Sequence, residues 1–330
     1  MPLPATAAGR RSFDLFPGAG GTSKSASTTT VLVAFLMNVL VAVAKSVAAV
    51  VTGSASMLAE AAHSWADSGN EIFLMVANRR SRRPPDAKHP IGSGKEAYVW
   101  SLVAALGLLA AGGAVSIMRG VQELLEPTTG GDFAVAYVVL AVSFILESVS
   151  FTRSIRQSKP EAESMHRDLI EHVLVTSDPT LRAVVAEDAA ALTGLVLAAV
   201  GLLASELTGS SVPDGMASIL IGLLLGGVAI VLINLNRRFL VGEEVDSRVR
   251  GAALRELLAM PEVARVTYLR LEVVGPRSVL IVGDVDLVGD DVESRVAVRL
   301  RTLEAKIRDS PAVAGAVLSL SAPDEPSLSL

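Results

Sequence analysis

The stretch Ser54–Glu71 reads SASMLAEAAHSWADSGNE and includes four regularly spaced polar side chains, Glu60, His63, Asp67 and Asn70. They follow one another at steps of three, four and three residues. On a helix of about 3.6 residues per turn, these steps put all four on one face. The side chains at i and i+4 can converge on one small object, and an imidazole nitrogen with a carboxylate oxygen is half of the ligand set of a tetrahedral Zn²⁺ ion. The sequence therefore predicts half of a metal site here, with the other half supplied from elsewhere in the chain.

The composition is that of a membrane protein. The chain has 330 residues, of which 51% are hydrophobic, and its mean hydropathy is +0.50. These values are too apolar for an ordinary soluble protein. The chain has no cysteine, which excludes disulfides and thiolate metal sites, and its net charge of −5 argues against a nucleic-acid partner.

Long apolar segments occupy most of the first three quarters of the chain. Each is near the ~20 residues that a helix needs to cross a bilayer. We predict six spans, at residues 28–52, 56–79, 97–122, 132–154, 182–207 and 214–237. Residues 1–27 are rich in Gly, Ala, Ser and Thr, and we expect a disordered tail. Arg10–Phe13 weakly resembles a twin-arginine export signal, but the next apolar run begins too late for that reading to be favoured.

Basic residues alternate between the connections. They follow the second, fourth and sixth segments, as Arg79, Arg80, Arg82, Arg83, Lys88 and Lys95, then Arg153, Arg156 and Lys159, then Arg237 and Arg238. The connections near 52–55, 126–132 and 207–214 contain no Lys or Arg. By the positive-inside rule, both termini are predicted to be cytoplasmic. We expect a multi-pass integral membrane protein, with a bacterial plasma membrane as its location.

The pattern changes from about Gly242. Helical spacing over 249–258 is followed by strand patterns over 266–274 and 278–288, helical spacing over 291–309 and a strand pattern over 313–320. This α-β-β-α-β order is compatible with a small ferredoxin-like domain. The predicted fold class is thus an α-helical membrane protein with six transmembrane helices plus a C-terminal cytoplasmic ferredoxin-like α+β domain. The predicted boundaries are a tail at 1–27, a membrane domain at 28–240, the small domain at 241–320 and a tail at 321–330.

Three stretches carry a family resemblance. They are GSASMLAEAAHSWAD at Gly53–Asp67, RPPDAKHPIGSGK at Arg83–Lys95, and GEEVD at Gly242–Asp246. Together with the six segments and the α-β-β-α-β order, they resemble the cation diffusion facilitator family of divalent-metal transporters over roughly residues 28–320. The resemblance implies a homodimer whose terminal domains pair in the cytoplasm. It also implies metal export driven by proton entry, with a tetrahedral site between the second and fifth spans.

The fifth segment departs from the usual family pattern. The resemblance implies a His-x-x-x-Asp or Asp-x-x-x-Asp pair on each of the two spans, but here the acids are the adjacent Glu187 and Asp188. Adjacent side chains diverge by about 100° around a helix, so we expect only one, mainly Asp188, to reach the site. An acidic pair at this position is similar to that of the zinc-transporter-9 group of the family. The predicted metal ligands are His63, Asp67, Asp188 and Glu187. The imidazole favours Zn²⁺, whereas the oxygen-rich second half leaves Mn²⁺ or Fe²⁺ open.

Other polar residues within the apolar segments are candidates for supporting roles, because intramembrane ionisable groups are costly and usually face a cavity or a partner. Glu60 and Asn70 share the His63 face and are accessory ligand candidates. Lys45, in the middle of the first segment, is a candidate ion-pair partner for the acids of the fifth. Glu147 in the fourth segment either relays protons or forms a structural pair.

The loops and the terminal domain offer weaker candidates. Asp86 and His89 lie where many family members have an Asp and two His as a second metal site, but Ser93 replaces the later His, and a fixed turn is the alternative. The basic run 79–83 predicts contact with lipid headgroups. His166 and His172 are expected to lie on the surface. The terminal domain has no His or Cys, so we expect it to dimerise rather than to sense zinc.

The favoured function is secondary transport of a divalent cation, with the metal ion and protons as transported species, membrane lipid and a second copy of the chain as partners, and no cofactor. An intramembrane metalloenzyme would need a motif such as His-Glu-x-x-His, which the sequence lacks. A non-transporting membrane scaffold remains the other alternative.

Overall fold

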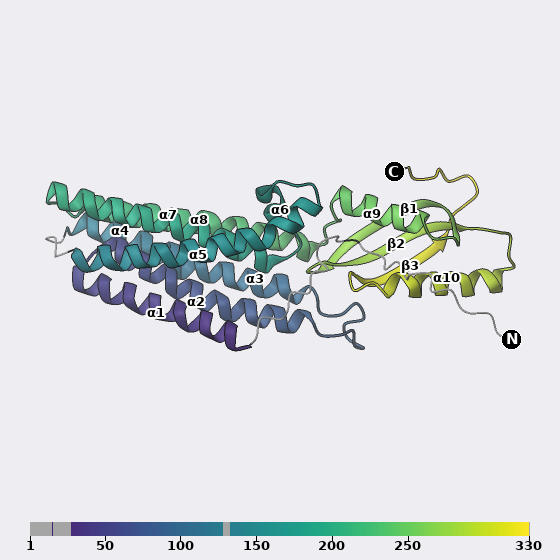
Figure 1. Cartoon of the computed structure of the whole chain (residues 1–330), viewed down its shortest axis with the longest axis horizontal. Helices are drawn as coiled ribbons and strands as arrows, with labels where there is room; N and C mark the ends of the chain where they lie inside the picture. Colours follow the sequence, from purple (N-terminus) through teal and green to yellow (C-terminus); the bar gives the residue numbers. More distant parts are fainter. Residues whose placement is uncertain (1–14, 16–27, 128–132, 330) are drawn as a thin grey trace.

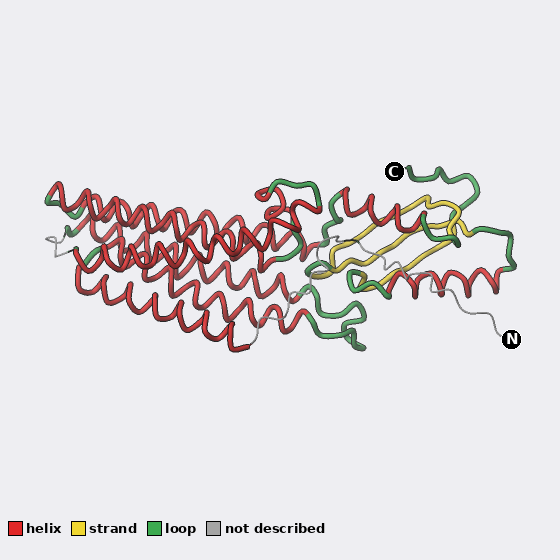
Figure 2. Tube along the Cα trace, in the orientation of Figure 1, coloured by secondary structure: helices red, strands yellow, loops and turns green. Residues whose placement is uncertain are grey.

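The computed structural model describes residue 15 and residues 28–127 and 133–329. Long helices form an elongated bundle, and a small sheet with its helices extends from one end of that bundle (Figure 1). Figure 2 shows that the strands are confined to this end. The predicted tail at 1–27, apart from residue 15, and the export-signal candidate lie outside the described residues.

The helices and strands follow in this order. They are α1 (Thr28–Thr52), α2 (Ala55–Ser81), α3 (Glu96–Gly107), the π-helical η1 (Leu108–Ala114), α4 (Val115–Leu125), α5 (Ala134–Ser164), α6 (Leu169–Val175), α7 (Pro179–Thr208), α8 (Val212–Val241), α9 (Ser247–Leu258), β1 (Val263–Gly275), β2 (Ser278–Leu287), α10 (Glu293–Arg308) and β3 (Val313–Leu320).

Within the described residues, five helical stretches are long and apolar enough to cross a membrane. They lie at Phe35–Thr52, Glu96–Leu125, Ala134–Ser164, Pro179–Thr208 and Val212–Val241. Helix α2 has 27 residues and packs inside the bundle against α1, α3 and α8, but its polar side chains keep it below the same apolar threshold. The predicted second span is therefore a long bundle helix whose polarity distinguishes it from the other five.

Local sequence explains where the principal helices begin and end. The Ser54 hydroxyl caps α2 by accepting a hydrogen bond from the Met57 N–H. The Asp178 carboxylate caps α7 by accepting from Thr180 and Leu181, with a proline at the helix start. Gly209 ends α7 at φ +65°, a left-handed conformation that glycine adopts without strain.

The small domain confirms the predicted α-β-β-α-β order. Its sheet has the order β1-β2-β3, with β1 antiparallel to β2 and β2 parallel to β3. Apolar side chains of α9 and α10 pack with one face of the sheet in a single core that includes Val249, Leu257, Leu269, Ile281 and Ile307. The other face carries the exposed Tyr268 and Val317.

The connection between α5 and α7 differs from the prediction. Helix α5 continues to Ser164, past the predicted end near 154, and α6 follows as a short additional helix. His172, expected on the surface, is buried with 1% exposure, because α6 folds back against the junction between the bundle and the small domain. His166 is exposed, as expected.

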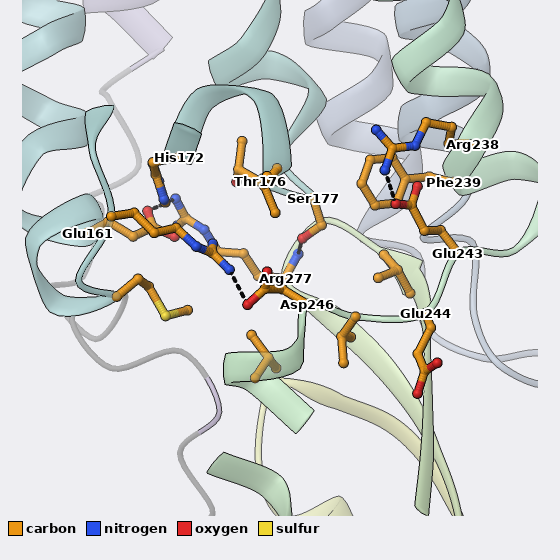
Figure 3. A pocket seen from close by; sticks show the side chains of 16 residues that line it. Glu161, His172, Thr176, Ser177, Arg238, Phe239, Glu243, Glu244, Asp246 and Arg277 are labelled. Carbon is orange, nitrogen blue, oxygen red and sulfur yellow. Dashed lines mark hydrogen bonds and ion pairs between the residues drawn. The ribbon is translucent and has the colours of Figure 1, made fainter. Parts of the chain in front are cut away.

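Ion pairs join the bundle to the small domain around a cavity of about 300 Å³ (Figure 3). Arg277, in the β1–β2 turn, reaches Glu161 of α5 at 2.6 Å. In the opposite direction, Arg167 of the α5–α6 loop reaches Asp246, the cap of α9, at 2.6 Å. His172 lines the same cavity. An arginine of the small domain thus pairs with a carboxylate of the bundle, and an arginine of the bundle's α5–α6 loop pairs with a carboxylate of the small domain.

Candidate metal site

The predicted i, i+4 pair lies inside the bundle. The Nε2 atom of His63 is 3.4 Å from the Oδ2 atom of Asp67. The imidazole is buried, and neither of its nitrogens has a hydrogen-bond partner among the described residues. Buried polar groups are normally satisfied, so an imidazole left in this way has capacity for a further ligand.

Glu60 and Lys45 form a buried ion pair beside these residues. The Lys45 Nζ atom is 2.9 Å from the Glu60 Oε2 atom, and both side chains are fully buried. Glu187 or Asp188 was the predicted partner of this lysine, and that prediction is wrong. Lys45 lies on α1, which packs mainly against α2 and α5, so its nearest acid is on α2.

A cavity of about 100 Å³ lies between α1, α2, α5 and α7, and Asp67 lines it. Its polar lining comes mainly from carboxylates on three of these helices. It is lined by Asn38, Val41, Ser64, Asp67, Glu71, Leu74, Glu147, Ser150, Val184, Glu187 and Asp188. Such a group of acids inside an apolar bundle attracts a cation.

Both acids of α7 line this cavity, and the prediction that only one reaches the metal stays a prediction. Glu187 turns toward α2, where its Oε1 atom accepts a hydrogen bond from Asn70 Nδ2 at 2.9 Å. Asp188 turns toward α5 and accepts from the Ser150 and Ser154 hydroxyls, at 3.2 and 3.1 Å. The two side chains do point in different directions around α7, but both line the cavity because it extends from α2 to α5.

Sequence reasoning missed three polar residues at this cavity: Glu71 and Ser150 line it, and Ser154 bonds to Asp188. The Oε1 atom of Glu71 accepts a hydrogen bond from Asn38 Nδ2 at 2.5 Å. Ser150 and Ser154 follow the predicted candidate Glu147 at spacings of three and four, which place all three on one face of α5. That spacing was the available signal, because serines at such intervals in an apolar helix mark a polar face.

The acids face one cavity but do not converge on one point. Among the described residues, no group of three or more His, Cys, Asp or Glu side chains is close enough to hold a metal ion.

The loop candidates, Asp86 and His89, form a turn. The Asp86 carboxylate accepts hydrogen bonds from the backbone N–H groups of Lys88 and His89, at 2.8 and 2.6 Å. These hydrogen bonds, chiefly that from His89, lower the pKa of the Asp86 carboxyl. The His89 Nδ1 atom is 3.0 Å from Asp86 Oδ1, and both side chains are exposed. The arrangement fits the fixed-turn alternative.

Comparison with known proteins identifies the family. A family model described as the cation efflux transmembrane domain matches residues 31–240. The chain belongs to the cation efflux family. This confirms the resemblance to the cation diffusion facilitators, which are multi-pass membrane transporters rather than enzymes.

Named relatives of this cation efflux protein include zinc antiporters. It is 36% identical over 236 residues to metal tolerance protein C4 of Arabidopsis thaliana, covering 72% of this chain and 52% of that protein. It is 30% identical over 260 residues to the human mitochondrial proton-coupled zinc antiporter SLC30A9, covering 78% of this chain and 46% of the relative. The likeness to magnetosome protein MamB of Paramagnetospirillum magneticum is 25% over 285 residues, 86% of this chain and 85% of that protein. The chain thus spans about half the length of the first two relatives, and they support the predicted zinc-transporter-9-like branch.

Proposed function

We propose that this protein exports a divalent metal cation from the cytoplasm in exchange for protons, with the metal site between α2 and α7. One observation carries the proposal: carboxylates of α2, α5 and α7 line one cavity inside the bundle. Burying several acids in an apolar environment is costly unless a cation or protons compensate them. A site that alternates between the two is what metal–proton exchange requires.

The proposed ligands are His63, Asp67, Glu187 and Asp188. Asp67 of α2 and Glu187 of α7 line the cavity, and His63 contacts Asp67. Asp188 of α7 also lines the cavity and is bonded to Ser154 of α5. Metal binding needs a neutral imidazole and ionised carboxylates, so protons compete with the metal at the same groups. Movement of α2 against α7 then completes or opens the shell, as in other transporters with a site between moving helices.

Zn²⁺ is the preferred cargo because the set includes an imidazole. The relatives named zinc antiporters support the same choice. Mn²⁺ and Fe²⁺ are the alternatives, since the other donors are oxygen atoms. Asn70 has a supporting role, because its amide holds Glu187 toward α2. Glu60 is assigned to Lys45 rather than to the metal.

The test is metal-driven proton flux in proteoliposomes, with Zn²⁺, Mn²⁺ and Fe²⁺ compared. Wild type is measured beside His63→Ala, Asp67→Asn, Glu187→Gln and Asp188→Asn. Glu206→Gln is the matched control, because this acid is also on α7 but is exposed and bonded to Tyr137.

We expect flux with Zn²⁺ in the wild type and in Glu206→Gln, and at least about a tenfold loss in His63→Ala, Asp67→Asn and Glu187→Gln, since each removes a ligand. Unchanged flux in Glu187→Gln with loss in Asp188→Asn would assign the α7 ligand to Asp188 alone. Absence of flux with every metal in the folded wild type would favour a non-transporting scaffold.

We further propose a homodimer formed through the small domain, with both termini in the cytoplasm. The open face of the sheet supports it, because Tyr268 of β1 and Val317 of β3 leave apolar surface exposed there. Static light scattering of Val317→Glu beside wild type tests it. A monomeric variant that keeps its fold supports this interface, and an unchanged mass refutes it.

A further inference from the structure

A buried acid that the proposed function does not use lies at the opposite end of the bundle from the sheet. Asp214, in the first turn of α8, is only 3% exposed. The α1–α2 and α7–α8 turns meet at this end, which we call the far end (Figure 1). The cavity of the candidate metal site is instead lined by residues such as Glu71 and Glu187, which lie in the halves of α2 and α7 nearer to the small domain.

Asp214 holds the beginning of α2. Its carboxylate accepts hydrogen bonds from the backbone N–H groups of Ala55 and Ser56, at 2.6 and 3.3 Å. It also accepts from the Ser54 hydroxyl at 2.9 Å and from the Ser56 hydroxyl. The Asp214 N–H in turn donates to the Ser205 hydroxyl of α7 at 3.0 Å. One side chain thereby connects the ends of α2, α7 and α8.

The chemistry of these contacts explains why a charged group is stable there. The first N–H groups of a helix have no partner within the helix, and the helix dipole favours an anion at that position. Four donors surround the carboxylate, so its burial leaves few unmet hydrogen bonds.

The surroundings of Asp214 are closely packed. Helices α4 and α8 cross at glycines, so a Cβ atom added at Gly215 would come within 3.1 Å of the Gly120 carbonyl oxygen. The Ser218 hydroxyl donates to the Ser116 carbonyl across the same contact, at 2.8 Å. Helices α4 and α8 are therefore in close contact beside Asp214.

We propose that Asp214 is a positioning residue for transport: it clamps the start of α2 to α8, keeps the far end closed, and releases α2 when the site opens to that side. This rests on the proposed function, because only a transporter requires the far end to open. Helix α2 carries His63 and Asp67, so the clamp acts on the metal site through that helix.

Side-specific labelling tests the clamp without any metal. The chain has no cysteine, so a single Met57→Cys reports access to the first turn of α2, where Met57 is fully buried. A charged maleimide is applied to the protein in lipid nanodiscs, with and without Asp214→Asn. Ser210→Cys, at an exposed far-end position, is the labelling control.

We expect Asp214→Asn to raise the labelling rate of Cys introduced at position 57 by about tenfold or more, because loss of a charge-assisted hydrogen bond shifts an equilibrium by roughly that factor. The rate at position 210 stays the same. Ser56→Ala, which removes one donor, raises the rate by a smaller factor and serves if Asp214→Asn does not fold.

Flux measurements separate a clamp from a static helix contact. Asp214→Asn changes the maximal rate of transport but leaves the metal concentration for half-maximal flux unchanged, because Asp214 is not a ligand. Equal labelling of folded wild type and both variants would overturn the proposal. That outcome is independent of the proposed function, since labelling is read whether or not the wild type transports metal.

Discussion

Removal of Glu60 tests whether this acid stabilises the bundle or binds the metal. The perturbation is Glu60→Gln, which keeps the shape of the side chain and removes its charge. In the structure the Glu60 carboxylate lies 2.9 Å from the Lys45 ammonium, and both side chains have zero exposure. The substitution therefore leaves a buried lysine without its counter-ion.

The magnitude follows from this geometry. At 2.9 Å and an effective dielectric constant of about 20, the attraction of two unit charges is about 6 kcal/mol. The cost of removing both charges from water offsets much of that gain, so the net contribution of the intact pair is small. Removing one partner is different, because the remaining charge keeps its desolvation cost. We expect Glu60→Gln to destabilise the protein by about 3–5 kcal/mol.

The assay is thermal unfolding in detergent of wild type, Glu60→Gln, Lys45→Met and the double variant. The double variant removes both charges and keeps apolar volume, so it should recover most of the stability lost in either single variant. Stability of Glu60→Gln within about 1 kcal/mol of wild type would refute the reasoning. Metal flux restored in the double variant shows that Glu60 is not a ligand, whereas flux lost in a stable double variant assigns it to the metal.

Two further predictions concern stability. Burial lowers the pKa of the His172 imidazole, and the guanidinium groups of Arg167 and Arg277 lower it further, so the unfolded chain takes up a proton more readily than the folded one. The stability associated with neutral His172 is therefore fully present above about pH 6.5 and is lost as the pH falls below that value. The melting temperature of His172→Leu, measured from pH 8 to pH 5.5, should depend less on pH than that of wild type. Parallel profiles for the two proteins would contradict this. Gly120→Ala places a methyl group 2.9 Å from the backbone nitrogen of Ile219, and we expect it to lower the free energy of unfolding by about 1–3 kcal/mol, as measured by thermal unfolding. The control is Gly227→Ala, whose methyl group meets nothing within 4 Å and which should be neutral or slightly stabilising. Equal melting temperatures for the two alanine variants would show that α4 and α8 separate without cost.

The fold was largely predictable because its signals are periodic and local. The order of the terminal domain follows from alternation in the strands and from the Gly275-Pro276 turn, and the final strand begins and ends where predicted. The end of α5 was not predictable. The chain past residue 154 is polar and carries Pro160, which predicts a helix end, but the helix continues to Ser164. Contacts with the rest of the junction decide that end, and they involve residues distant in sequence.

The site was predictable only within single helices. The spacing of His63 and Asp67 placed them together because both are on α2, and periodicity determines such a pair. The partner of Lys45 depends on which helices are neighbours, and no local pattern states that. The same limit explains why Asp214 was missed, since a lone acid in the first turn of a helix is ordinary until its contact with α2 is known.

Helix α2 takes part in three buried acidic contacts of the bundle, and its polarity follows from them. Its beginning is held by Asp214, its next turns carry Glu60 beside Lys45, and its later turns bring Asp67 and Glu71 to the cavity. In the first two contacts the acid is bonded to donors of the protein itself, whereas the described residues that line the cavity include several acids and no lysine or arginine. A rigid helix transmits displacement along its length, so release at one end moves the acids at the other. The polar residues that make α2 the least apolar of the long helices are therefore those through which binding at the cavity and closure of the far end can be coupled.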